Sequence, residues 1–275
     1  MALYMNYQTF EPHADLAPLV KCYWTLQVPA QKDVQRQLVI PDGCIEMAFV
    51  FGDEIKRYTS DDEFIIGPRE VIIGQITETT YIEPTGYVDS FTVRFYPYGF
   101  ANFVSTPLEA LANTETPLAR FFGEASAGRL AHRMIQAGDT KARIAIIEEF
   151  LLSRLSDTGT IDTIVQTTIE TMFATKGSSA IKAMVKNDAS KRRQLEREFK
   201  QKIGISPKQL GKVIRLQTAL KRVLNRQSET LTEIAYESEY YDQAHFIKDF
   251  REFTGTTPKK FLGSEQMALS SLFYK

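Results

Sequence analysis

Ser190-Lys-Arg-Arg-Gln-Leu-Glu-Arg-Glu-Phe-Lys-Gln-Lys202 has the most specific pattern in the chain. Leu195 and Phe199 lie four residues apart, so in a helix they form one apolar side. The charged side chains on another side are Arg192, Arg193, Glu196 and Arg197. Arginine carries a flat fork of donors that fits two phosphate oxygens or the O6/N7 edge of guanine. This stretch therefore predicts either a recognition helix for the major groove of DNA or a charged helix that faces only solvent.

The same pattern is repeated later in the chain at a constant offset. The matched pairs are Leu195 and Phe246, Phe199 and Phe250, Gly204 and Gly255, and Pro207 and Pro258. In each copy the Gly suits a left-handed C-cap, and the Ser-Pro or Thr-Pro that follows suits the start of a new helix. A shorter helix is expected before each long one, at residues 179–186 and 231–236. The repeat thus favours two helix-turn-helix units over a single solvated helix.

A long segment with an apolar face joins the two copies, from Pro207 to about Asn225. Its apolar residues recur at helical spacing: Leu210, Val213, Ile214, Leu216, Leu220 and Leu224. We predict one rigid helix, about 28 Å long at a rise of 1.5 Å per residue. Successive major-groove faces of B-DNA are ~34–36 Å apart, so one chain could place two helices in adjacent grooves.

Residues of about 177–263 resemble the DNA-binding domain of AraC/XylS-type transcription regulators. The matching residues are Leu195-Glu-Arg-Glu-Phe-Lys, Gly204-Ile-Ser-Pro207, Arg215-Leu-Gln-Thr-Ala219, Thr232-Glu-Ile-Ala235, Asp242-Gln-Ala-His-Phe246, Phe250 and Gly255-Thr-Thr-Pro258. The resemblance implies that residues 191–202 and 242–253 are recognition helices. It implies contacts with bases or backbone by Lys191, Arg192, Arg193, Glu196, Arg197, Gln243, Ala244, Ile247 and Lys248. For His245 two roles stay open, a contact with DNA or local packing.

Two residues depart from the family pattern. Glu239 stands where a turn Gly is usual, which costs on the order of 1 kcal/mol if the turn needs a positive φ. Met184 stands where the first helix of a unit usually has a small Ala, a position that Ala235 fills in the second unit. The second recognition helix is also less basic, because it carries Asp242 and Asp249 beside Lys248. We therefore expect the first unit to supply more of the DNA affinity.

The net charge hides an uneven distribution along the chain. The 275 residues carry 33 Lys/Arg and 34 Asp/Glu, a formal net charge of −1, and 43% are hydrophobic. From Lys176 onward there are 20 basic and 11 acidic residues, which leaves 13 and 23 before it. Between Lys191 and Arg226 the counts are 12 and 2. The length allows two domains, and the C-terminal part is the expected nucleic-acid side, with strongly salt-dependent binding.

The cysteine content and the N-terminus favour a cytoplasmic protein. Cys22 and Cys44 are the only cysteines, too few for a disulfide framework and without the spacing of a metal site. The first residues lack the basic start and apolar core of a signal peptide. No apolar run approaches the ~18–20 residues that span a bilayer.

The first part of the chain has the pattern of an antiparallel β domain. Segments rich in aromatic and β-branched residues, separated by turns with Gly or Pro, occur at 20–28, 44–51, 71–73, 79–82 and 90–96. Such strands favour a closed barrel or a sandwich. Helices are expected afterwards at 127–137, 141–155 and 161–173. Asp139 or Thr140 would cap the second of them.

Residues of about 20–122 also resemble an uncharacterised sensory domain that is often fused to AraC-type DNA-binding modules. The matching residues are Tyr23-Trp24, Pro41-Asp-Gly43, Glu46, Gly74, Val93-Arg94-Phe95 and Gly99-Phe100. The resemblance implies a cupin-like β-barrel and supplies no ligand. The expected fold class is therefore α+β in two domains: an N-terminal antiparallel β-barrel with following helices, and a C-terminal all-α double helix-turn-helix.

No motif in the sequence indicates catalysis. A metal-binding cupin enzyme needs several histidines on neighbouring strands, whereas His13, His132 and His245 all lie outside the expected strands. The sequence contains no G-x-S-x-G elbow, P-loop or dinucleotide fingerprint. We therefore expect no cofactor, no metal and no enzymatic activity.

A small-molecule pocket inside the barrel is the alternative to a filled interior. The candidate lining residues are Trp24, Glu46, Phe49, Phe91, Arg94 and Phe95. Arg94 would then recognise a carboxylate or phosphate, and Glu46 a cation or hydroxyl. In the competing interpretation the aromatic side chains only fill the core, and Arg94 and Glu46 point to solvent or pair with each other.

The predicted organisation is a sensory β-barrel at 1–122, a helical connector or dimerisation region at 123–176, the double helix-turn-helix at 177–263 and a tail at 264–275. The predicted function is a sequence-specific DNA-binding transcription regulator, controlled by a small molecule in the barrel. RNA polymerase and a second copy of the chain are further candidate partners. Two alternatives stay open: a constitutive DNA binder whose barrel serves only dimerisation, and a cupin-type enzyme fused to a DNA-binding domain.

Overall fold

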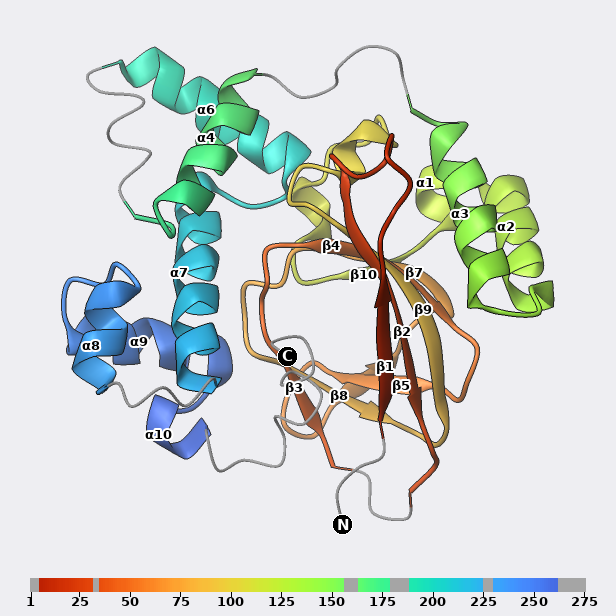
Figure 1. Cartoon of the computed structure of the whole chain (residues 1–275), viewed down its shortest axis with the longest axis horizontal. Helices are drawn as coiled ribbons and strands as arrows, with labels where there is room; N and C mark the ends of the chain where they lie inside the picture. The colour runs from red at the N-terminus through yellow and green to blue at the C-terminus, as the bar shows by residue number, and fades with distance from the viewer. Residues whose placement is uncertain (1–4, 32–34, 156–162, 179–187, 225–229, 262–275) are drawn as a thin grey trace.

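The computed structural model describes residues 5–31, 35–155, 163–178, 188–224 and 230–261. It has two parts, an N-terminal set of antiparallel sheets followed by helices and a C-terminal helical part (Figure 1). The α+β class and the two-part organisation expected from the sequence are thus confirmed. In Figure 1 the C-terminal helices lie on one side of the β domain, and the helices of residues 119–152 lie on the opposite side.

The larger sheet has six antiparallel strands in the order β1-β2-β9-β4-β7-β10. In chain order they are β1 (Asn6–Phe10), β2 (Val20–Val28), β4 (Ile45–Val50), β7 (Glu70–Ile73), β9 (Val88–Phe95) and β10 (Glu115–Pro117). The central strand β9 places Phe91, Val93 and Phe95 on one face and Thr92 and Arg94 on the other, and all five are buried. The sheet therefore has one apolar face and one face that carries polar groups.

The apolar face of this sheet forms the largest core of the N-terminal part. It packs against the segments that follow: η1 (Phe100–Asn102), η2 (Glu109–Leu111), α1 (Ala119–Phe122), α2 (Glu124–Gln136) and α3 (Thr140–Leu152). Helices α2 and α3 are those expected at 127–137 and 141–155. Asp139 caps α3, because its carboxylate accepts a hydrogen bond from the Ala142 N–H at 2.8 Å.

The smaller sheet has four antiparallel strands in the order β3-β8-β5-β6. They are β3 (Gln37–Val39), β5 (Ile55–Tyr58), β6 (Phe64–Ile66) and β8 (Thr80–Pro84). The chain passes from the larger to the smaller sheet at Gly52, whose N–H donates to the Asp89 carbonyl. A Cβ at Gly52 would lie 2.3 Å from the Tyr87 carbonyl oxygen, so only glycine fits this corner.

The sequence predicted a closed β-barrel, and the described residues do not form one. Their strands form two open sheets, and no ladder joins one sheet to the other. The strands at three of the four sheet edges, β3, β6 and β10, have three residues each, and none of them pairs across the gap. The antiparallel β architecture is confirmed, whereas closure is not observed.

The C-terminal part is built around a long central helix. Its helices are α4 (Thr163–Ala174), α6 (Ala189–Lys202), α7 (Pro207–Leu224), α8 (Leu231–Glu237), α9 (Gln243–Thr254) and α10 (Pro258–Phe261). Gly204 and Gly255, which follow α6 and α9, have positive φ angles of 89° and 68°. The helix expected at residues 179–186, with Met184, lies outside the described residues.

Helix α7 contributes to two separate cores. Leu210 and Ile214 pack in a first core with residues of α4 and α6, whereas Leu216 and Leu220 pack in a second core with residues of α8, α9 and α10. Helix α4, which the sequence assigned to a connector, therefore packs on α6 and α7 of the C-terminal part rather than on α2 and α3.

The turn between α8 and α9 places Glu239 at a φ of 63°. We predict that Glu239→Gly raises the free energy of unfolding by about 1 kcal/mol, because glycine adopts a left-handed backbone without the Cβ penalty. Glu239→Ala removes the charge but keeps the Cβ, so it should give no comparable gain. Chemical denaturation of the three proteins measures the difference. Equal gains in both variants would assign the effect to charge and not to the backbone.

Candidate nucleic-acid interface

Helix α6 is held by its first turn and its apolar side. The carboxylate of Asp188 accepts hydrogen bonds from the N–H groups of Ser190 and Lys191 at 3.0 Å. These bonds, the one from Lys191 foremost, lower the pKa of the Asp188 carboxyl. Leu195 and Phe199 are fully buried in the first core. The opposite side of the helix is thus presented to solvent in a fixed orientation.

The exposed side of α6 carries arginines in weak ion pairs. The Arg192 and Arg197 side chains keep 67% and 65% of their accessible surface. Arg192 Nε lies 3.2 Å from Glu196 Oε1, and Arg197 Nη2 lies 3.3 Å from Glu198 Oε1. Exposed pairs of this kind add little stability and exchange readily with other partners. These guanidinium groups are therefore available to phosphate oxygens or guanine edges.

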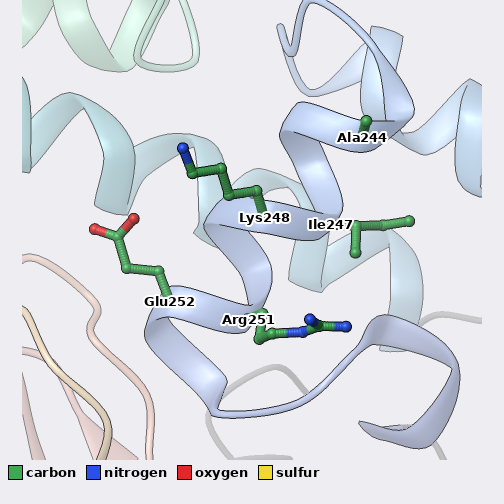
Figure 2. A pocket seen from close by; sticks show the side chains of 5 residues that line it. All are labelled: Ala244, Ile247, Lys248, Arg251 and Glu252. Atoms are coloured by element: carbon green, nitrogen blue, oxygen red, sulfur yellow. The ribbon is translucent and has the colours of Figure 1, made fainter.

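Helix α9 presents a second exposed face. Asp242 caps the helix by accepting a hydrogen bond from the His245 N–H at 2.7 Å, and Phe246 and Phe250 are buried in the second core. The outward residues line an open hollow: Ala244, Ile247, Lys248, Arg251 and Glu252 (Figure 2). Figure 2 shows Lys248 and Arg251 extending from successive turns of the helix. The hollow thus combines two cations and the Glu252 carboxylate with small and apolar side chains.

Asp249 lies inside the protein and not on this exposed face. It is 2% exposed, and its carboxylate lies 3.4 Å from Lys212 Nζ and 3.8 Å from Arg215 Nη2, both on α7. The sequence counted Asp249 among the charges that make the second recognition helix less basic, and that premise is wrong. The carboxylate is turned inward because the side of α9 that bears it packs on α7.

Arg251 is an exposed cation of α9 that was not among the residues predicted from the sequence. It follows Ala244 and Lys248 at helical spacing, so the periodicity of α9 could have identified it. Glu252, its neighbour, is held by Lys212, whose Nζ lies 2.9 Å from Glu252 Oε2. The positive charge of Arg251 is therefore not cancelled by the adjacent carboxylate.

Two of the predicted DNA-binding residues in the second unit also have partners within the protein. Gln243 Oε1 accepts a hydrogen bond from the Thr232 hydroxyl at 2.9 Å. The His245 ring meets the Tyr240 ring edge-on at 5.3 Å, and its Nε2 lies 3.6 Å from Asp249 Oδ2. Both side chains are only partly buried, so each links the start of α9 to its surroundings and still reaches the surface.

The aromatic side chains predicted to line a pocket lie in the apolar core. Phe49, Phe91 and Phe95 are each at most 1% exposed and pack between the larger sheet and the following helices. The ring of Phe95, for example, lies 5.4 Å from the ring of Phe100. These three residues therefore fill the core, as in the second of the two interpretations that the sequence left open.

The other three predicted pocket residues, Trp24, Glu46 and Arg94, meet on the opposite face of the sheet. Arg94 Nε donates to Glu46 Oε1 at 2.7 Å, and Trp24 Nε1 donates to the same oxygen at 3.1 Å. Arg94 Nε also lies 3.4 Å from Asp42 Oδ2. Burial raises the pKa of the Glu46 carboxyl, and the charge of Arg94 opposes this shift. Arg94 is thus engaged by two carboxylates of its own domain.

The N-terminal part docks on α7 through the segment that leads into β4. Gln217 Nε2 of α7 donates a hydrogen bond to the Pro41 carbonyl at 2.5 Å. Gly43 lies so close that a Cβ there would be 3.1 Å from Leu210 Cδ1. Ile40 is buried in the second core, among residues of α7 to α10. The β domain therefore covers part of the helix that packs against both α6 and α9.

Further contacts connect the N-terminal part with α6 and α9. The Leu108 N–H donates to the Gln201 carbonyl near the end of α6 at 2.8 Å. The Thr79 hydroxyl donates to the carbonyl oxygen of Glu252 in α9 at 3.3 Å. An ion pair between Lys200 and Glu109, at 3.1 Å, is exposed at the rim. The docking thus relies on backbone carbonyls and apolar side chains more than on the opposite charges of the two halves.

Two known families match this chain. Residues 8–117 match a domain of unknown function (DUF6597), and residues 189–264 match a helix-turn-helix domain. The chain thus has an N-terminal DUF6597 domain and a C-terminal helix-turn-helix domain. The buried and exposed sides of α6 and α9 agree with the helix-turn-helix match. No curated protein sequence matches the chain.

Several solved structures resemble this chain at low identity. ToxT from Vibrio cholerae covers 96% of this chain and 98% of its own, at 9% identity and a TM-score of 0.47. ToxT bound to an unsaturated fatty acid covers 95% of each chain, at 11% identity and a TM-score of 0.42. An AraC-type regulator from Chromobacterium violaceum covers 36% of this chain and 88% of its own, at 24% identity and a TM-score of 0.31. Likeness at this level says nothing about the sites or ligands of this chain.

The described part of the chain contains no helix that is both long and apolar enough to cross a membrane. Within the same residues, no group of three or more His, Cys, Asp or Glu side chains is arranged to hold a metal ion.

We predict that Asp249→Ala lowers the free energy of unfolding by about 2–3 kcal/mol, because it leaves the cations of Lys212 and Arg215 partly buried beside each other without their shared carboxylate. Glu252→Ala removes a more exposed carboxylate that also pairs with Lys212, so it should cost well under 1 kcal/mol. Urea denaturation of both variants measures the two losses. Equal small losses would show that Asp249 does not fix α9 on α7.

Proposed function

We propose that this AraC-type regulator binds duplex DNA with α6 and α9 in successive major grooves, and that its N-terminal domain controls this binding in response to a small molecule. The observation that carries the proposal is the orientation of the two helices. Each buries its aromatic residues in a core that includes α7 and directs arginine or lysine outward. Because α7 is one helix of 18 residues, about 27 Å long, it fixes the spacing between the two units.

In the first unit, the five proposed contact residues offer distinct chemistry to DNA. Arg192, Arg193 and Arg197 can donate in pairs to phosphate oxygens or to the O6 and N7 atoms of guanine. Lys191, in the first turn, suits a phosphate group. Glu196 can accept a hydrogen bond from the N4 amino group of cytosine.

In the second unit, the proposed contacts include apolar ones. Ala244 and Ile247 suit the methyl group of thymine, and Gln243 suits the N6 and N7 atoms of adenine. Lys248 and Arg251 supply positive charge to the backbone or to guanine. His245 would lie near the DNA side through its partly exposed ring. The inward position of Asp249 supports a larger share of the affinity for this unit than the sequence suggests.

We expect the full-length protein to bind duplex DNA from its own upstream region about 10³-fold more tightly than a scrambled duplex of equal length. Arg193→Ala with Arg197→Ala should lose most of this preference, since each paired contact contributes about 1–3 kcal/mol of discrimination. Arg129→Ala, which removes an exposed cation on α2, is the matched control and should keep it.

Fluorescence anisotropy at several salt concentrations measures the affinities. Weak binding at equal strength to both duplexes by the unaltered protein would contradict sequence-specific recognition. An undiminished preference in the double variant would contradict the role of α6.

The turn at Pro41 and Asp42 connects the ligand-binding face of the N-terminal domain to α7, so ligand binding could change the position of α7 through this turn. Asp42 pairs with Arg94, the residue that also binds Glu46 on the polar face of the sheet. The adjacent Pro41 carbonyl accepts the hydrogen bond from Gln217 of α7. A small molecule that competes for Arg94 or Glu46 would therefore shift the turn that holds α7. Such a molecule regulates only if it binds the docked and released arrangements with unequal affinity.

The polar face of the sheet also offers groups that suit a ligand. The buried hydroxyl of Thr92 has no hydrogen-bond partner in the described structure, and Thr92 lies opposite Trp24 in the strand register. Burial raises the pKa of Tyr7 to about 12, so its hydroxyl stays protonated, and its ring lies 5.9 Å from that of Trp24. Because Arg94 already binds two carboxylates, this face supports a neutral, hydrogen-bonding effector rather than an anion.

Asp42→Asn and Gln217→Ala test this route, since they act on either side of the Pro41 carbonyl. We expect each to change DNA affinity by about threefold or more in the same direction. The double variant should match the larger single effect, because both changes break one link. Thr218→Ala is the control, since the Thr218 hydroxyl bonds within α7 to the Ile214 carbonyl. Additive effects of Asp42→Asn and Gln217→Ala would contradict a shared route.

A further inference from the structure

Strand β6 exposes three consecutive large apolar side chains. The exposed fractions are 46% for Phe64, 47% for Ile65 and 43% for Ile66. β6 is the last strand in the order β3-β8-β5-β6, and among the described residues it pairs only with β5. An open sheet edge with apolar side chains on both faces is a template for another strand. We infer that two copies of this chain associate by antiparallel pairing of β6 with β6.

The backbone of β6 leaves alternate positions free for such pairing. The Thr59 N–H donates to the Glu63 carbonyl, and the Gly67 N–H donates to the Ile55 carbonyl. In an antiparallel ladder the hydrogen-bonded positions alternate. Glu63, Ile65 and Gly67 therefore turn their backbone groups towards β5. The two residues between them direct their N–H and C=O groups towards the open edge.

If a two-fold axis relates the two strands at Ile65, the free N–H and C=O groups of Phe64 and Ile66 gain hydrogen-bond partners. It sets Phe64 of each copy opposite Ile66 of the second copy, and the two residues exchange hydrogen bonds in both directions. Ile65 then lies opposite Ile65 of the second copy in a non-hydrogen-bonded pair, where side chains approach most closely.

The side chains of β6 match under the same axis. Phe64 and Ile66 share one face of the strand, where the Phe64 ring lies 5.8 Å from the Tyr58 ring and 4.9 Å from Lys56 Nζ. Pairing about the axis brings Phe64 against Ile66 twice on this face. It brings Ile65 against itself on the other face. All three exposed side chains are thereby covered by apolar partners.

The size of this contact sets its strength. Pairing of three-residue strands buries much less than the ~1,200–2,000 Å² of a stable protein interface. We therefore expect a weak, reversible dimer in solution. Two copies bound side by side on DNA would associate more completely, because the duplex raises their effective concentration.

Cysteine substitution tests the register of the pairing. The Cα atoms of a non-hydrogen-bonded antiparallel pair are ~4.5 Å apart, within the range of a disulfide. Mild oxidation should convert most of the Ile65→Cys variant into a covalent dimer. Ile66→Cys should stay mostly monomeric, because its opposite residue is Phe64. Unaltered protein, with free Cys22 and Cys44, sets the background. No cross-link in Ile65→Cys, or equal cross-linking of both variants, would overturn the proposal.

Sedimentation equilibrium tests the association without a covalent bond. The mass of the unaltered protein should rise with concentration from the 31.3 kDa of one chain towards twice that value. Ile65→Lys sets like charges opposite each other and should abolish the rise. Ile135→Lys alters a residue of α2 that is 57% exposed and should leave the rise unchanged.

The proposal is overturned if the unaltered protein stays monomeric, if Ile65→Lys associates as strongly as the unaltered protein, or if only Ile135→Lys is monomeric. None of these measurements uses DNA, so their outcome is independent of the proposed function.

Discussion

Burial of α7 by three different parts of the molecule is the constraint on which the rest of the structure depends. Leu210 lies in the core that holds α6, Leu220 lies in the core that holds α9, and Gln217 contacts the N-terminal domain at Pro41. Burying one leucine side chain contributes about 1.5–3 kcal/mol, so separating α6 or α9 from α7 costs at least that much free energy. Because one helix bears all three contacts, the proposed mechanism has a shift at the N-terminal turn change the orientation of both α6 and α9.

Local sequence patterns predicted the C-terminal helices, whereas the partners of individual side chains depended on tertiary structure. The four-residue spacing of Leu195 and Phe199 and the glycines after α6 and α9 act within a few residues, so the sequence was sufficient to place these helices. The side of α9 that faces α7 is set by packing between distant segments. For that reason Asp249 was counted as a surface charge and Arg251 was not recognised.

The β domain shows the same division between local and long-range information. The sequence indicated most of the strands, but β2 pairs with β9 and β4 lies between β9 and β7, and no local pattern specifies such pairing. Alternation along β9 already implied that Arg94 and Phe95 face opposite sides, and the structure agrees. Arg94 and Glu46 pair with each other, one of the arrangements that the sequence left open. Their connection through Asp42 to the docking turn could not be foreseen, because it joins segments that meet only in the folded protein.

In the proposed mode of DNA binding, α7 holds α6 and α9 in register with two successive major grooves. Hydroxyl-radical footprinting of the full-length protein on its own upstream DNA tests this most directly. We predict two protected patches per chain on one face of the duplex, one helical turn apart, with the first lost in the Arg193→Ala, Arg197→Ala variant and the second retained. A single protected patch per chain, or loss of both patches together, would contradict the account.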